Sequence, residues 1–287
     1  MSTSAIDAIR AAGGTRIAGP RAIDGDWRRI LALSWTLAYS EFRLKFFGSV
    51  LGYFWQLGRP LMLFGVYYLV FTEFVPVNDK VKFFPPLLLF GVMLYQFFAE
   101  ATGASVQAVV ARENLVRKIH FPRIVIPVSV VLTSSFNLAL NMIAVGIFMG
   151  LSGVPLTVRF LELIPIIGLL LVFVLGLSML LSALFVRYRD VAPIWDVIAM
   201  ALFYGTPILY PLEAVQIGWA RDLIMFNPLA VVQQQLRHAL FDPSVGGAAA
   251  AIGGYGKLAI PIGIVVGTLL LGFYVFNRSA PEVAENL

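Results

Sequence analysis

Residues 163–186 read Leu-Ile-Pro-Ile-Ile-Gly-Leu-Leu-Leu-Val-Phe-Val-Leu-Gly-Leu-Ser-Met-Leu-Leu-Ser-Ala-Leu-Phe-Val, a run that holds no charged side chain. An α-helix rises about 1.5 Å per residue, so about 20 apolar residues cross the hydrocarbon core of a bilayer. This run is therefore predicted to be a membrane-spanning helix. Five more long apolar runs, three of which hold a single charged residue, lie at roughly 47–72, 83–110, 124–151, 191–212 and 258–276. Together the runs predict an all-α integral membrane protein with six spans within residues 47–278.

The composition of the whole chain agrees with a membrane protein. Of its 287 residues, 59% are hydrophobic and 13% are charged, whereas soluble domains hold about 45–50% apolar and about 25% charged residues. These values argue against a disordered chain and against a water-soluble enzyme. The chain has no cysteine and two histidines, so disulfides and thiolate metal ligands are excluded and no metal site is expected.

The basic residues indicate the orientation. They mostly flank the apolar runs, which is typical of topogenic charge and argues against a nucleic-acid partner. Of the 21 Lys and Arg residues, fourteen fall in inner segments if both termini are cytoplasmic, six fall in outer segments, and Arg59 lies within a span. Cytoplasmic segments carry the excess of such residues, so cytoplasmic termini are predicted. Residues 1–26 and 279–287 are then cytosolic tails.

Residues 27–46 differ from a membrane span. Apolar side chains recur there at helical spacing, at Trp27, Leu31, Trp35, Ala38, Phe42 and Phe46. Only residues 30–40 lack charge, which is too few to cross a bilayer. We expect an amphipathic helix in the membrane interface, capped at its start by Asp26. This helix serves either as a plain anchor or as a docking element for a cytosolic partner.

The loop at residues 213–257 is predicted to lie outside and to hold short re-entrant helices. Asn227 and Pro228 form a helix start, with Asn as the N-cap and Pro at the first helical position. The helix is expected to end at Asp242-Pro243, so it is too short to span and dips into the outer leaflet. The candidate residues of this outer gate loop are Asn227, Pro228 and Arg237.

Four segments occur in a characteristic order. They are Gly-Ser-Val-Leu-Gly-Tyr-Phe-Trp-Gln-Leu-Gly-Arg-Pro-Leu at 48–61, Arg-Lys-Ile-His-Phe-Pro at 117–122, Arg-Tyr-Arg-Asp at 187–190 and Asn-Pro-Leu at 227–229. Together they resemble the permease subunit of type-2 ATP-binding-cassette (ABC-2) exporters. The resemblance is to the branch that exports O-antigen, teichoic acid, capsule or galactan chains. Arg59 departs from the family pattern, which more often has a small polar residue before Pro-Leu.

The resemblance implies a multi-pass protein of the bacterial plasma (inner) membrane, and a homodimer that works with two copies of a cytosolic ATPase. The implied cargo is a polysaccharide or a pyrophosphate-linked lipid glycan; a drug or lipid cargo is the alternative. The sequence has no Gly-x-x-x-x-Gly-Lys-Ser/Thr loop, whose backbone N–H groups hold nucleotide phosphates. ATP and Mg²⁺ are therefore expected on the partner, no cofactor is expected on this chain, and its role is that of a transport subunit.

Basic residues near the inner surface are candidates for contact with the ATPase. The resemblance implies a short coupling helix between the second and third spans, although the same charges would also suffice for topology. The candidates are Arg112, Glu113, Arg117 and Lys118, joined by Arg28 and Arg29. Arg43 and Lys45 are candidates to receive the phosphate of a lipid-linked cargo, or equally the headgroups of anionic lipids.

Charged and aromatic side chains within the spans are candidates for the translocation path. Arg59 and Glu100 both fall near mid-depth, where an unpaired charge is costly, so we expect them to pair as a brace or to line one aqueous path. Asp196 is expected at the cytosolic mouth. Aromatic rings stack on the apolar faces of sugars, although interface belts and core packing use the same residues. The aromatic candidates are Trp55, Tyr67, Phe71, Tyr95, Phe98, Tyr204 and Tyr210.

Overall fold

The computed structural model of the chain describes residues 26–46, 50–74, 81–113, 122–155 and 157–279, and regular structure within them is entirely helical. The long helices are α2 (Trp27–Phe46), α3 (Val50–Leu69), α4 (Phe84–Ala111), α6 (Val125–Leu151), α7 (Leu163–Arg187), α8 (Val191–Tyr204) and α12 (Tyr255–Ser279). The shorter helices are α9 (Gly218–Phe226), α10 (Pro228–Leu236) and α11 (Ala248–Ile252). Single helical turns are η1 (Val70–Phe74), η3 (Val158–Glu162), η4 (Leu212–Ala214) and η5 (Arg237–Phe241).

Four helical segments within the described residues are long and apolar enough to cross a membrane: 84–111, 125–151, 158–187 and 255–279. They coincide closely with four of the six predicted spans. The first predicted span corresponds to α3, which contains Pro60.

The helix expected over the predicted span at 191–212 ends early, because α8 ends at Tyr204. Pro207 follows three residues later and lacks the backbone N–H that a continuing helix needs. The Thr206 hydroxyl instead donates to the Leu202 carbonyl at 2.6 Å. At 14 residues, α8 is therefore shorter than the other helices of the bundle.

The core of the bundle forms around α4. This helix starts Phe84-Pro85-Pro86, with both prolines in its first turn, where the missing N–H groups cost nothing. Its side chains pack against α6, α7 and α8, and Leu88, Met93 and Phe98 are essentially inaccessible. Burial on most sides explains why α4 is apolar around its circumference.

The helices α7 and α12 approach each other closely. A Cβ on Gly176 would lie 2.7 Å from the backbone of Leu269, and a Cβ on Gly272 would overlap the Gly176 carbonyl oxygen. Small residues allow helix backbones in membranes to approach closely, and these two glycines bring the last helix onto the bundle.

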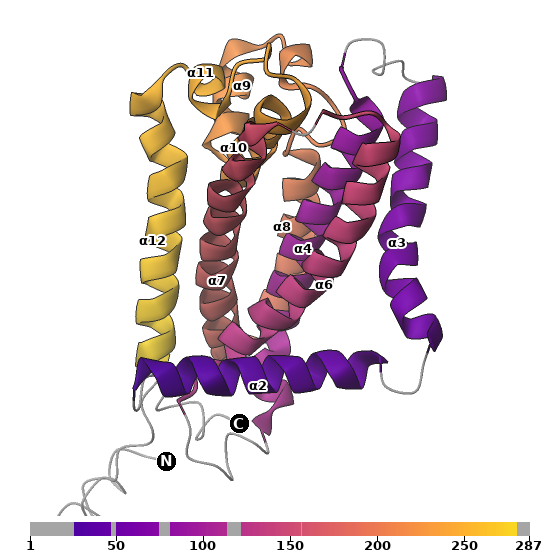
Figure 1. The fold of residues 1–287 in the computed structure, drawn as a ribbon. Coiled ribbons are helices and arrows are strands. Elements are labelled where there is room, and N and C mark those ends of the chain that lie inside the picture. The colour runs from indigo at the N-terminus through magenta and orange to yellow at the C-terminus, as the bar shows by residue number, and fades with distance from the viewer. Residues whose placement is uncertain (1–25, 47–49, 75–80, 114–121, 156, 280–287) are drawn as a thin grey trace, which may run out of the picture.

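The helix α2 lies across one end of the bundle, which we call the α2 end (Figure 1). The short helices α9, α10 and α11 gather at the opposite end, the α10 end (Figure 1). The predicted cap at Asp26 is confirmed, because its carboxylate accepts from the Arg28 backbone N–H at 3.3 Å. Ser34 and Ala38 of α2 are buried, and Trp35 packs edge-on against Phe136 of α6 with ring centroids 5.1 Å apart.

The predicted helix start in the long loop is confirmed. The Asn227 side chain accepts from the Leu229 backbone N–H at 3.0 Å, and Pro228 occupies the first helical position of α10. The helix continues through η5 and ends before Asp242. The side chain of Asn227 also donates to Thr206 at 3.0 Å, which ties α10 to the chain that leaves α8.

Candidate functional site

Aromatic rings from three helices form a contact series across the bundle. Tyr67 of α3 stacks on Phe203 of α8 with centroids 5.7 Å apart, and Tyr95 of α4 meets the same ring edge-on at 4.9 Å. Phe203 also contacts Tyr204 edge-on at 5.3 Å. This series joins α3, α4 and α8, which carry most of the aromatic candidates for the translocation path.

The structure divides those candidates by exposure. Tyr95 and Phe98 are buried, and the Tyr95 hydroxyl donates to the Ala199 carbonyl. These two rings therefore contribute to the core. Tyr67, Phe71 and Tyr210 are half-buried at its edge, whereas Trp55 and Tyr204 are exposed.

One face of α8 exposes an acid among apolar side chains. Asp196 is exposed, and so are Val197, Met200 and Tyr204, whereas Trp195 is buried and donates from its indole N–H to the Thr102 hydroxyl at 3.1 Å. A carboxylate on a helix surface in lipid is costly, and such groups usually face a bundle interior or a water-filled cavity. This face of α8 is therefore suited to contact with water or with another protein surface.

Ion pairs fasten α2 to the bundle. Lys45 donates to Glu100 of α4 at 2.9 Å, and Asn137 of α6 donates to the same carboxylate at 2.7 Å. Arg112, at the end of α4, pairs with Glu41 of α2. The sequence pointed to Lys45, Glu100 and Arg112, but it did not indicate that Lys45 pairs with Glu100. It also gave no sign of Asn137 and Glu41, because a lone Glu or Asn carries no signal of a contact made across helices.

The other charged candidates have varied surroundings. Arg28 and Arg29 are exposed on α2, with the Arg28 guanidinium carbon 5.9 Å from the Trp27 ring centroid. Arg43 is also exposed and lies 5.9 Å from the Tyr39 ring centroid. Glu113 is half-buried just after α4. Arg117, Lys118 and the side chain of Arg59 lie outside what the structure describes, so the pairing of Arg59 with Glu100 stays a prediction.

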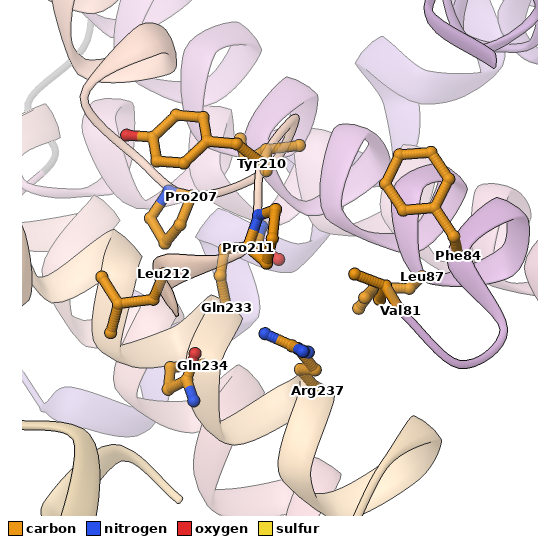
Figure 2. A pocket seen from close by; sticks show the side chains of 11 residues that line it. Val81, Phe84, Leu87, Pro207, Tyr210, Pro211, Leu212, Gln233, Gln234 and Arg237 are labelled. Carbon is orange, nitrogen blue, oxygen red and sulfur yellow. The ribbon is translucent and has the colours of Figure 1, made fainter. Parts of the chain in front are cut away.

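A small pocket lies at the α10 end. Figure 2 shows the side chains that line it, which come from the start of α4, the chain after α8, and α10 with η5. Arg237 is buried there and donates to Glu213 at 2.7 Å. Gln233 is also buried and donates to the Gly91 carbonyl of α4 at 3.1 Å. Gln233 thus fastens α10 to α4, and Arg237 ties η5 to η4. The sequence had pointed to Arg237 but not to Gln233.

These features define a multi-pass membrane protein, with an ion-paired helix across one end and polar-braced short helices at the other. The chain matches the family model described as ABC-2 type transporter over residues 32–241. It belongs to that family. The match begins within α2 and ends at η5, so it includes the exposed face of α8 and the capped helix α10.

Two relatives extend the comparison. The O-antigen export system permease protein RfbA of Myxococcus xanthus is 31% identical over 209 residues, which cover 72% of this chain and 79% of the relative. A protein of the same name from Klebsiella pneumoniae is 28% identical over 250 residues, which cover 86% of this chain and 92% of the relative.

Proposed function

We propose that the chain is the membrane permease of an ATP-driven exporter that moves a polysaccharide or lipid-linked glycan from the cytoplasmic leaflet across the plasma membrane. The observation that carries the proposal is the similarity to O-antigen export permeases along most of both chains. The exposed face of α8 supports it, because an acid beside aromatic rings suits a hydrated sugar chain better than it suits lipid tails.

The proposal includes six membrane crossings, with α3 and α8 added to the four long apolar helices. α8 is about 21 Å long at 1.5 Å per residue, so the chain that follows it completes the crossing. The end of α12 lies at the α2 end (Figure 1), as expected for an even number of crossings. The excess of Lys and Arg in the segments of that end supports its placement in the cytoplasm.

The proposal also includes a homodimer with its path between the two copies. Trp55 of α3 and Tyr204 of α8 are 57% and 60% exposed, and Asp196 lies on the same helix as Tyr204. Apposition of two such surfaces would remove the acid from lipid and place aromatic rings along a shared path. Asp196, close to the start of α8, would lie at the cytosolic mouth.

Energy comes from a separate cytosolic ATPase that binds the α2 end and carries ATP and Mg²⁺. The segment around Arg117 and Lys118 would couple the two proteins, with Arg112 held in place by Glu41 on α2. Movement at this contact would then reach α2 and α4 together. The exposed Arg28 and Arg29 extend the basic surface available to the ATPase.

The test is the ATPase activity of the permease purified with its co-expressed ATPase, with and without a lipid-pyrophosphate-linked glycan. We expect the glycan to stimulate hydrolysis only when the permease is present. The variant Arg117→Glu/Lys118→Glu should insert normally but lose stimulation, whereas Arg159→Glu, in η3 at the opposite end, should keep it. A stable complex without a glycan response would shift the cargo to a drug or lipid, and failure to form any complex would overturn the proposal.

A further inference from the structure

A second polar pocket lies at the α2 end, between the last turns of α7 and α12. Its lining includes Arg187 and Tyr188 from the end of α7, and Tyr274, Arg278 and Ser279 from the end of α12. The pocket holds about 800 Å³ of empty space, counted with its open mouth. It is separate from the ion pairs of α2 and from the aromatic series of α8.

No acid of the described residues compensates the charge of this pocket. Neither Arg187 nor Arg278 forms an ion pair with an acid of the described chain, and no Asp or Glu belongs to the lining. Arg278 donates to the Tyr274 hydroxyl at 3.3 Å, and the Arg187 guanidinium carbon lies 5.8 Å from the Tyr188 ring centroid. A guanidinium has five N–H donors, so most donors of both arginines are free to bind an anion.

An exposed stripe on α12 leads directly to these cations. Residues four apart are neighbours on a helix surface, and α12 presents Ile262, Val266, Leu270, Tyr274 and Arg278 at that spacing, so they form a continuous exposed ridge that winds along the helix. Leu270 and Tyr274 are 62% and 60% exposed. The stripe therefore changes from apolar side chains to the phenol of Tyr274 and then to the guanidinium of Arg278. A phospholipid changes in the same order, from its apolar acyl chain to its charged headgroup.

We propose that this pocket binds the phosphate of an anionic phospholipid, with an acyl chain along the exposed face of α12. Arg187 and Arg278 donate to the phosphate oxygens, and the hydroxyls of Tyr274 and Ser279 complete the polar surface. Arginine suits this role because its planar donors match phosphate geometry. The bound lipid neutralises two cations and fills the space between α7 and α12. The site does not depend on the identity of the exported cargo.

The test measures lipids that remain bound to the full-length permease. The purified protein is delipidated in detergent, incubated with phosphatidylglycerol, phosphatidylcholine or inorganic phosphate, and analysed by native mass spectrometry. We expect a retained phosphatidylglycerol adduct and no comparable phosphatidylcholine adduct. The variant Arg187→Gln/Arg278→Gln should bind phosphatidylglycerol at least about tenfold more weakly, because it loses two cations at the membrane surface.

Control variants distinguish lipid binding at this pocket from nonspecific attraction to charges on the surface. Arg189→Gln removes a cation from the same end, but that guanidinium lies 5.0 Å from the Phe185 ring centroid and does not line the pocket, so binding should stay at the wild-type level. If the double variant does not fold, each single Gln variant should still weaken binding severalfold. Equal phosphatidylglycerol retention in the pocket variants and the wild type would overturn the proposal. If millimolar inorganic phosphate abolishes lipid retention, the proposal is also overturned, because the ligand of the pocket would then be a soluble phosphate compound.

Discussion

One carboxylate oxygen of Glu100 accepts hydrogen bonds from Lys45 at 2.9 Å and from Asn137 at 2.7 Å. The three residues lie on α4, α2 and α6, so a single acid joins the helix that crosses the α2 end to two helices of the bundle. The sequence predicted other roles for these two residues: for Glu100 a brace with Arg59 or a contact in an aqueous path, and for Lys45 a contact with a cargo phosphate or a lipid headgroup. Exchanging the charges of Lys45 and Glu100 distinguishes the structural role from the predicted ones.

Lys45→Glu and Glu100→Lys should each destabilise the protein, and the double exchange should recover most of the loss. The pair is partly exposed, so each single variant should cost about 0.5–1 kcal/mol. The measurement is a double-mutant cycle from thermal melts of the purified permease, with export followed in parallel. Recovery of stability together with export supports a brace, whereas recovered stability with export still lost would assign a direct contact with the cargo.

Gly272→Ala should separate α7 from α12. The added methyl group would overlap the Gly176 carbonyl oxygen, and overpacking of a tight contact costs about 1–3 kcal/mol. The matched control is Gly263→Ala on the same helix, where nothing lies within 4 Å of the added Cβ, and it should be neutral. The melting temperatures of the two variants are compared. Equal changes in melting temperature would contradict the close crossing of α7 and α12.

Acid should weaken the α10 end through Asp242. Burial by itself raises the pKa of this carboxyl. Hydrogen bonds from the Ser244 hydroxyl and backbone N–H, together with Lys82, have the larger opposite effect, so the pKa lies below the ordinary value of 3.8. A lowered folded-state pKa contributes stability above the unfolded-state pKa, and this stability is lost as the pH falls through the folded-state pKa. The loss is therefore expected below about pH 4.

The variant Ser244→Ala tests that contribution. It should be about 1 kcal/mol less stable than the wild type at pH 7, and the difference should shrink once Asp242 is protonated. Melting temperatures between pH 7 and pH 3 measure the difference, with Ser40→Ala, at an exposed site on α2, as the control. A difference that stays constant over this range would exclude the titration of Asp242 as its cause.

The pair of Arg237 and Glu213 should behave as a half-buried brace. The Arg237 side chain is 9% exposed and that of Glu213 is 47% exposed, so Glu213→Ala leaves a buried cation without its carboxylate and should cost about 1–2 kcal/mol. The double variant Arg237→Met/Glu213→Ala also removes the buried charge, so it should be more stable than Glu213→Ala alone.

The control for this brace is Asp222→Ala. It breaks the exposed pair with Lys257 and should have little effect. Denaturation of the purified permease ranks the three variants. A double variant less stable than Glu213→Ala alone would show that the guanidinium acts through packing and not through charge.

Much of the fold was predictable because the bilayer imposes a simple length rule. Long apolar runs predicted α4, α6, α7 and α12 closely, and local capping chemistry predicted the starts of α2 and α10 from Asp26 and Asn227. The end of α8 was mispredicted, because apolar composition continued past Pro207 after the helix had stopped. The partners of Glu100 and Arg112 were out of reach, since Lys45 and Glu41 lie 55 and 71 residues away in the chain.

The sequence by itself determined the apolar runs, the basic segments between them and the caps, because each depends on neighbours within a few residues and on the thickness of a bilayer. Only the tertiary structure decided which charges meet, that Gly176 and Gly272 bring α7 onto α12, and that Arg187 and Arg278 share one pocket. The physical reason is that these contacts depend on how helices cross in space, and helix crossing follows from the packing of whole surfaces.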